Sequence, residues 1–287
     1  MTADGKWRAM RRAQAVIRRD DFDAVWRDAR FYAEGALVEW SSITKTVTAR
    51  LLAKLARAGR VSSSTEVAEL LPFLPLNDVT LLDLSRHRSG LPVMHPGAST
   101  GLLSDPCRGS DNPQFLERVG LAAVEAARGF AGEFRYSNLG YSVLGLALER
   151  ACGRPWIDLV REWVLPVSEF PTVTVEPPPE QQAVPRFGGY RRRPWAMSDG
   201  AYRPAGGLWS SFGDLVAYAE NSLVHDSVSG WFLLGDGIRY HTGQGRDTGV
   251  CVILDLQRDR VGVAHAMLRT PDTARRILEH AMFDRLD

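Results

Sequence analysis

The chain has 287 residues, of which 45% are hydrophobic and 24% charged; this is an ordinary globular composition and excludes a disordered or fibrous protein. Its 35 basic and 34 acidic residues nearly cancel, which argues against a nucleic-acid-binding protein. Cys107, Cys152 and Cys251 are odd in number and widely spaced, so we expect free thiols rather than disulfides or a zinc site. No stretch approaches the roughly 18 consecutive apolar residues of a membrane span, and the basic N-terminus lacks the apolar core of a signal peptide. We therefore expect a cytoplasmic protein with no membrane or nucleic-acid partner.

The N-terminal part is expected to form two short strands and then a long helix. The strands are predicted at residues 12–19 and 23–32, on either side of a polar turn at 20–21. In residues 42–58 an apolar side chain recurs at every fourth position, which predicts a helix that ends at Gly59.

Capping signals predict further helices in the middle of the chain. They are a Thr80–Asp83 capping box, an Asn112-Pro113 start leading to about residue 128, a start just after Tyr136-Ser137-Asn138 with an end at Gly153, and a short segment at 155–165. Residues 166–204 are rich in proline, glycine and arginine and are expected to form loops, with Arg191-Arg192-Arg193 on a solvated surface.

The C-terminal part is expected to return to strands. Ser211 and Asp214 mark the start of a helix that reaches about residue 223. Strands are then predicted at 238–243, 248–256 and 261–268, and the polar turn between the last two makes them antiparallel neighbours. Pro271 begins a final amphipathic helix that extends to residue 286.

This order of elements predicts an α+β fold. One five-stranded antiparallel sheet would combine both ends of the chain, with the C-terminal helix on one face and the helical middle as a second lobe. We expect a single domain over residues 1–287, with a sheet lobe formed by 1–40 and 205–287 and a mainly helical lobe formed by 41–204.

Ser42 and Lys45 form a Ser-x-x-Lys pair at the start of the long predicted helix. Residues three apart lie on one helix face, so the lysine can reach the serine hydroxyl. A helix N-terminus stabilises negative charge on a nearby oxygen, and burial favours a neutral lysine that can take the serine proton. The pair fits an activated nucleophile. Alone, it also fits a capping serine followed by a surface lysine.

Tyr136-Ser137-Asn138 lies just before another predicted helix. A phenol has an ordinary pKa near 10, and a nearby lysine ammonium would lower that pKa, so Tyr136 is a candidate general base or acid. Asn138 offers an amide donor and a carbonyl acceptor. In isolation this segment also fits a half-buried aromatic residue and a capping asparagine.

His241-Thr242-Gly243 ends a predicted strand. A glycine there permits a ligand to approach the backbone closely, and the backbone N–H of Gln244 is a candidate donor to an oxyanion. In isolation the segment also fits a strand end with a turn glycine.

With Ser-x-x-Lys, Tyr-x-Asn and His-x-Gly in this order, the chain resembles the serine β-lactamase and penicillin-recognising superfamily, on its class C β-lactamase and esterase side. Three flanking segments add to the resemblance: Thr46-Val47-Thr48-Ala49, His87-Arg88-Ser89-Gly90-Leu91-Pro92, and Pro204-Ala205-Gly206-Gly207-Leu208 before a serine-capped helix. The resemblance covers residues 12–286.

The resemblance implies roles for the motif residues. Ser42 would be the acylated nucleophile, and Lys45 would share in its deprotonation. Tyr136 would activate Ser42, protonate the leaving group and activate the water that removes the acyl group. Asn138 would bind the carbonyl region of the substrate.

The same resemblance implies that His241, Thr242 and Gly243 border the acyl group, and that the N–H groups of Ser42 and Gln244 form the oxyanion hole. His241 departs from the family pattern, because β-lactamases of this class and DD-peptidases usually carry lysine there. A histidine is mostly neutral at pH 7, which weakens the case for a substrate that bears a carboxylate. Histidine at this position is common among the esterase-like members.

We therefore expect a serine hydrolase, an esterase or amidase, or an acyltransferase, that acts on a small-molecule substrate through an acyl-Ser42 intermediate. A β-lactamase or D,D-carboxypeptidase is one alternative, and a non-catalytic relative that binds a ligand in the same cleft is another. The six histidines show no ligand-like spacing with acidic residues, so we expect no metal and no cofactor.

Overall fold

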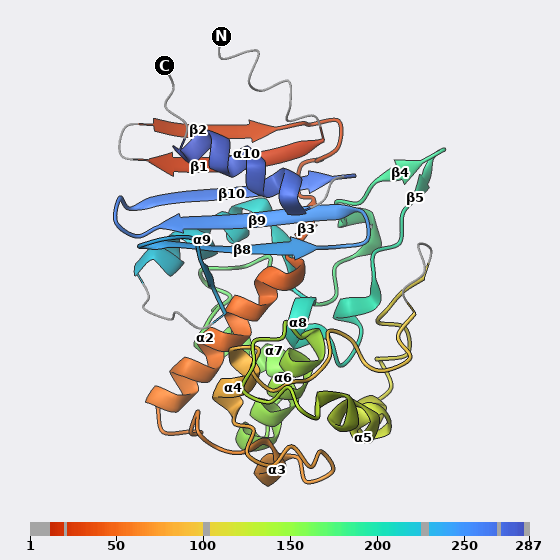
Figure 1. Ribbon diagram of the computed structural model, residues 1–287. Helices are drawn as coiled ribbons and strands as arrows, with labels where there is room; N and C mark the ends of the chain where they lie inside the picture. Colours follow the sequence, from red (N-terminus) through yellow and green to blue (C-terminus); the bar gives the residue numbers. More distant parts are fainter. Residues whose placement is uncertain (1–11, 20–21, 100–103, 225–229, 269–270, 284–287) are drawn as a thin grey trace.

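The computed structural model describes residues 12–19, 22–99, 104–224, 230–268 and 271–283. The predicted turn at 20–21 and the last predicted helix positions, 284–286, lie outside these residues. A layer made of a sheet and its covering helices lies above a lobe of helices in the view of Figure 1.

A six-stranded antiparallel sheet combines strands from both ends of the chain, in the order β2-β1-β10-β9-β8-β7 (Figure 1). The strands are β1 (Ala13–Arg19), β2 (Phe22–Arg27), β7 (Phe232–Leu233), β8 (Ile238–Gln244), β9 (Thr248–Asp255) and β10 (Arg260–Met267). The α+β class and the antiparallel pairing of the last two predicted strands are confirmed.

Two details of the sheet differ from the sequence-based prediction. It has a sixth strand, β7, which is only two residues long and so carries no alternating pattern that could reveal it. The strand predicted at 23–32 ends at Arg27, because Asp28 turns the chain: its carbonyl accepts from the N–H groups of Phe31 and Tyr32.

Helices cover both faces of the sheet. On one face, α10 (Pro271–Phe283) buries Ala274, Leu278 and Met282. On the other face lie α9 (Phe212–Val224) and the helical lobe. Strand β9 serves both cores, since Cys251 and Ile253 pack in the cluster that contains α10, and Val250 and Val252 pack in the larger one. Because β9 is buried on both faces, apolar residues occupy successive positions in its sequence and do not alternate with polar ones.

Helix α2 (Thr44–Arg57) runs from the edge of the sheet into the helical lobe, where other helices surround it (Figure 1). It contacts α4, α6, α7 and α8. The remaining helices of this lobe are η2 (Ser41–Ile43), α3 (Val67–Leu70), α4 (Leu81–Ser85), α5 (Phe115–Ala127), α6 (Asn138–Cys152), α7 (Trp156–Trp163) and α8 (Arg203–Gly206).

The helix starts that were predicted from capping residues agree only in part with the structure. The Thr80–Asp83 capping box is present, with the Asp83 N–H donating to Thr80 Oγ1 at 3.2 Å. The helix expected to follow Asn112-Pro113 begins only at Phe115, because Asn112 Oδ1 accepts from the N–H of Gln114 and forms a turn before the helix.

The segment predicted as loops contains short elements. They are η3 (Pro179–Gln181), the hairpin β4 (Arg186–Phe187) with β5 (Tyr190–Arg191), and η4 (Ala196–Ser198). A second small sheet pairs β3 (Leu37–Glu39) with β6 (Trp209–Ser211), and sequence analysis did not predict it. This pairing holds the segment that leads into η2, since the Trp40 N–H also donates to the Leu208 carbonyl at 2.9 Å.

Helix α8 packs unusually close to α6. A Cβ added to Gly145, in the middle of α6, would lie 2.1 Å from Pro204 Cγ in α8. On its other side, α8 accepts two hydrogen bonds from α2: Thr48 Oγ1 donates to the Pro204 carbonyl at 2.7 Å, and Lys45 Nζ donates to the Ala205 carbonyl at 2.6 Å. The missing side chain at Gly145 therefore lets α8 fit between α6 and α2.

Replacement of Gly145 by alanine should destabilise the protein although alanine is the better helix former. Alanine ordinarily gains about 1 kcal/mol over glycine within a helix, but the clash with Pro204 should cost more, leaving a net loss of about 1–3 kcal/mol. Denaturant unfolding measures the change. Gly213→Ala in α9 is the matched control, because an added Cβ there meets only Ser211 Oγ, at 3.7 Å. Equal stabilities of the two variants would contradict the role given to Gly145.

Candidate active site

Ser42 lies where the chain turns from β3 into α2. The preceding residue, Ser41, has a φ of 45°, a left-handed conformation that is costly for a residue with a side chain. The turn is held by the fully buried Trp40 and by Thr44 Oγ1, which accepts from the Leu208 N–H at 3.3 Å. Ser42 is thus placed in the 3₁₀ turn that opens α2, partly exposed, at the edge of β8.

Lys45 Nζ donates to Ser42 Oγ at 3.0 Å and to the Ala205 carbonyl at 2.6 Å. The side chain is fully buried, and burial lowers the pKa of Lys45 well below its ordinary value. Desolvation therefore favours the neutral amine, which is the form that can accept a proton. The structure thus brings Ser42 and Lys45 together as their spacing predicts.

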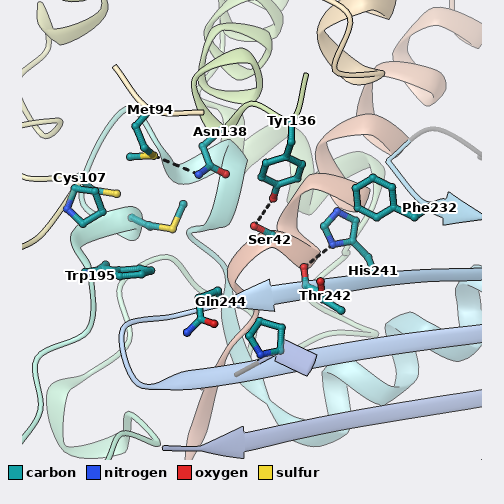
Figure 2. A pocket seen from close by; sticks show the side chains of 13 residues that line it. Ser42, Met94, Cys107, Tyr136, Asn138, Trp195, Phe232, His241, Thr242 and Gln244 are labelled. Carbon is teal, nitrogen blue, oxygen red and sulfur yellow. Dashed lines mark hydrogen bonds between the residues drawn. The ribbon is translucent and has the colours of Figure 1, made fainter. Parts of the chain in front are cut away.

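Tyr136 approaches Ser42 from the other side and donates its phenolic proton to Ser42 Oγ at 2.7 Å (Figure 2). Lys45 Nζ lies 5.0 Å from the centroid of the same ring. The expectation that a lysine ammonium lowers the Tyr136 pKa is wrong: burial raises this pKa to about 12. Desolvation opposes charge on both Lys45 and Tyr136, the two residues that contact Ser42, so Tyr136 is a neutral phenol in the resting site.

His87 supports Tyr136 from behind. The two rings lie 4.5 Å apart between centroids, and His87 Nδ1 accepts from the N–H of Ser137 at 3.0 Å. Burial lowers the pKa of His87 to about 3, so the ring is neutral. Sequence analysis placed His87 in a turn motif but assigned it no role; its link to Tyr136 comes from contacts 50 residues apart along the chain.

Asn138 begins α6 directly after the capping residue Ser137, whose Oγ accepts from the Gly140 N–H at 2.7 Å. Asn138 Nδ2 donates to Met94 Sδ at 3.3 Å (Figure 2). Its Oδ1 is buried and has no hydrogen-bond partner among the described residues. The side chain therefore offers a substrate an unused acceptor.

Strand β8 closes the site with His241, Thr242, Gly243 and Gln244. His241 Nδ1 lies 2.7 Å from the Thr242 carbonyl, so Nδ1 carries the proton and Nε2 is an acceptor, without a partner among the described residues. Burial, together with Lys45, lowers the pKa of His241 to about 3. The strand therefore presents a neutral imidazole.

Gly243 permits the close approach of β8 to the turn that carries Ser42. A Cβ at this position would lie 2.8 Å from the Trp40 carbonyl oxygen and 2.9 Å from Ser41 Cβ. The glycine is therefore needed for packing here, and its neighbour Gln244 folds its side chain back into the β8–β9 turn, donating to the Gly245 carbonyl at 2.6 Å. The backbone N–H groups of Ser42 and Gln244 remain the proposed oxyanion donors.

These residues surround an open pocket of about 380 Å³. Of the predicted site residues, Ser42, Tyr136, Asn138, His241, Thr242 and Gln244 line it. Lys45 lies behind Ser42, and Gly243 packs against the Trp40 carbonyl. The other lining residues could not be predicted from the sequence, because they come mainly from segments without a periodic pattern: Met94, Pro106, Cys107, Trp195, Met197, Phe232 and Pro271.

Glu39 is a buried acid just before the turn that carries Ser42. Thr248 Oγ1, at the start of β9, donates to Glu39 Oε2 at 3.1 Å, so the carboxyl group links β3 to the β8–β9 hairpin. Burial raises the pKa of Glu39 to about 7.

The described residues contain no group of three or more histidine, cysteine or acidic side chains placed to hold a metal ion. None of the helices in the described ranges is long and apolar enough to span a membrane.

Comparison with known proteins gives a family match over most of the chain. The model of a family described as Beta-lactamase matches residues 22–233. The D-alanyl-D-alanine-carboxypeptidase/endopeptidase AmpH of Escherichia coli K12 is 27% identical over 199 residues, which are 67% of this chain and 50% of that protein. A beta-lactamase of Providencia stuartii is 26% identical over 203 residues, covering 69% and 50%. The chain thus spans about half the length of the curated relatives it matches.

Solved structures share the fold. A beta-lactamase/D-alanine carboxypeptidase from Yersinia pestis, complexed with citrate, aligns with a TM-score of 0.73 at 18% identity, over 96% of this chain and 95% of that one. A beta-lactamase from Sulfitobacter sp. EE-36 has the same TM-score and identity, over 97% and 95%. At this identity the likeness concerns the fold alone.

The raised pKa of Glu39 predicts a pH dependence of stability. The folded pKa, about 7, lies above the ordinary value of 4.5, so the folded state binds more protons between these pH values. The Glu39 contribution to stability is therefore largest below about pH 4.5, falls as pH rises through 7, and is then lost. Glu39→Gln should remove this fall, making the variant more stable relative to wild type at pH 8 than at pH 5.

Unfolding in denaturant at both pH values measures the difference. Comparison with wild type at each pH cancels the contribution of the buried histidines to the pH dependence of the free energy of unfolding. Glu176→Gln, at an exposed position, is the matched control. The same stability difference at pH 5 and pH 8 would show that Glu39 titrates normally.

Proposed function

The chain belongs to the beta-lactamase family, and from this premise we propose that it is a serine hydrolase, an esterase or amidase, or an acyltransferase, that acts through an acyl-Ser42 intermediate. One observation carries the proposal: Ser42 Oγ lies 3.0 Å from Nζ of the buried Lys45 and 2.7 Å from the hydroxyl oxygen of the partly buried Tyr136, and the pKa shifts of both groups favour their neutral forms. Such a hydroxyl has a base in contact with it before the substrate arrives.

In the acylation step, Ser42 Oγ attacks the substrate carbonyl carbon and its proton passes to the neutral amine of Lys45. The family resemblance implies Tyr136 as the base, but we assign that role to Lys45 because burial raises the pKa of Tyr136 to about 12. The bond to the leaving group then breaks. Tyr136 gives its phenolic proton to the leaving atom, and the Lys45 ammonium restores that proton. The net transfer is one proton from Ser42 to the leaving group, and both proton carriers contact the same oxygen.

The negative charge on the tetrahedral intermediate would be stabilised by the N–H groups of Ser42 and Gln244. Loss of one such donor typically costs about 100- to 1000-fold in rate. Water then attacks the acyl-enzyme with Tyr136 and Lys45 acting in reverse, and an alcohol or amine in place of water makes the same chemistry an acyl transfer.

The pocket favours a small, neutral substrate. Its lining residues include no lysine or arginine, and His241 is neutral where related enzymes usually hold a charged lysine. A β-lactamase or D,D-carboxypeptidase activity is the second candidate, because two matched relatives carry these descriptions. The cytoplasmic location and the absence of nucleic-acid or membrane partners stay predictions, and we propose a reaction without cofactor.

Intact-protein mass spectrometry tests the nucleophile. A fluorophosphonate should add one adduct, peptide mapping should place it at Ser42, and Ser42→Ala should lose both the adduct and turnover while keeping its fold. A parallel incubation with penicillin separates the two candidates. A lasting penicillin adduct at Ser42, or rapid consumption of penicillin, would favour the second candidate over the first. Labelling that persists in Ser42→Ala would rule out the mechanism.

His241→Lys should restore affinity for a carboxylate. A lysine ammonium beside the substrate carboxylate should raise the rate of Ser42 acylation by penicillins about tenfold, the gain from one charge-assisted hydrogen bond. His280→Lys, at an exposed site in α10, is the control for added positive charge in general. If the two variants acylate equally, then pocket shape rather than the charge at position 241 sets the preference.

A further inference from the structure

A series of aromatic rings leads from the reacting atoms to the protein surface. Phe232 lies 5.0 Å from His241 and 6.4 Å from Tyr136, measured between ring centroids. Phe134 lies 6.2 Å beyond Phe232, and 60% of it is exposed to solvent. We call Tyr136, His241, Phe232 and Phe134 the aromatic strip.

The strip lies over Ser42 and extends to one side of it. In Figure 2, Tyr136 lies directly above Ser42, and His241 and Phe232 lie to one side, whereas Asn138, Met94 and Trp195 lie to the other. The two halves of the pocket therefore differ in chemistry. One is formed by stacked rings, and the other combines an amide with thioether, thiol and indole groups.

The position of the proton donor decides which part of the substrate each half receives. Tyr136 must contact the leaving atom in order to protonate it, so the leaving group lies on the Tyr136 side of the scissile bond. The acyl group then extends toward Asn138. This assignment makes the aromatic strip the continuation of the leaving-group site. It places His241 beside the leaving group, whereas the family resemblance implies that His241 borders the acyl group.

The charge on the strip defines the kind of leaving group. Burial keeps His241 neutral, and Tyr136 is a neutral phenol. An anionic leaving group would lose its hydration against these rings without gaining an ion pair from the strip. An aromatic group gains offset-stacked or edge-to-face contacts with Phe232, which lines the pocket, and with the exposed Phe134.

We propose that the aromatic strip binds a neutral aromatic alcohol as the leaving group of the substrate, with Phe232 holding its first ring and the exposed Phe134 holding a second. The inference rests on the proposed function, because it uses the role of Tyr136 in that mechanism. Phe232 and Phe134 would be specificity-determining residues, and the preferred substrates would be aryl esters with an extended apolar leaving group.

Two acetate esters test the strip. Phenyl acetate and 4-biphenylyl acetate share one acyl group and have leaving phenols of similar acidity, so their kcat/KM ratio reports the binding of the second ring. The wild-type enzyme should prefer the biphenylyl ester. Phe134→Ala should lower this ratio by about threefold to tenfold, the range of one aromatic contact. Phe187→Ala, which removes an exposed ring on β4, should retain the wild-type ratio.

A second pair of esters shows whether the strip holds the leaving group or the acyl group. Phenyl 3-phenylpropanoate and phenyl acetate differ only on the acyl side, and their ratio in Phe134→Ala should keep its wild-type value. A leaving-group ratio unaffected by Phe134→Ala, or an acyl-side ratio that falls instead, would overturn the inference. Hydrolysis of these esters that persists in Ser42→Ala would instead contradict the proposed function.

Discussion

The burial of Lys45 against Ser42 is the constraint on which the rest of the site depends. An amine without an acidic partner is stable inside a protein only as the neutral base, and its donors still need acceptors. One acceptor is Ser42 Oγ, and the other is the Ala205 carbonyl at 2.6 Å. That carbonyl reaches Lys45 only because α8 fits between α2 and α6, which in turn requires that position 145 has no side chain. The packing of three helices thus places an acceptor beside the buried amine.

A second constraint acts at the edge of the sheet. Ser42, the proposed nucleophile, belongs to the helical lobe, while the strand that would hold the substrate belongs to the sheet, so the two must be held at a fixed separation. Gly243 removes the atoms that would push β8 away from Trp40, and the left-handed Ser41 turns the chain at the point of contact. Glu39 then links β3 to the start of β9 through Thr248. Backbone strain at Ser41 is tolerated because the surrounding structure is buried and hydrogen-bonded.

The sequence predicts best what local spacing determines. Ser42 and Lys45 are three residues apart on one helix, so their contact follows from helical geometry, and the capping box at Thr80 is equally local. The contact between Tyr136 and Ser42 joins residues 94 apart, and only the family resemblance anticipated it. The direction of the Tyr136 pKa shift was predicted wrongly, because burial of the phenol raises its pKa and burial also disfavours the lysine ammonium that was expected to lower it. Phe232, Met94 and Trp195 were missed, since short strands and loops carry no periodic pattern.

Selectivity in such a site follows from its unpaired acceptors as much as from missing cations. Asn138 Oδ1 and His241 Nε2 are buried acceptors without a partner among the described residues, and they lie on opposite sides of Ser42. A carboxylate brings only further acceptors, so it would face lone pairs and gain no hydrogen bond from either atom. An N–H or O–H of a neutral substrate would satisfy such an atom and remove its desolvation penalty. The fold shared with beta-lactamases therefore does not decide the substrate: a neutral imidazole at position 241 changes both the charge of this wall and the direction of its hydrogen bonding.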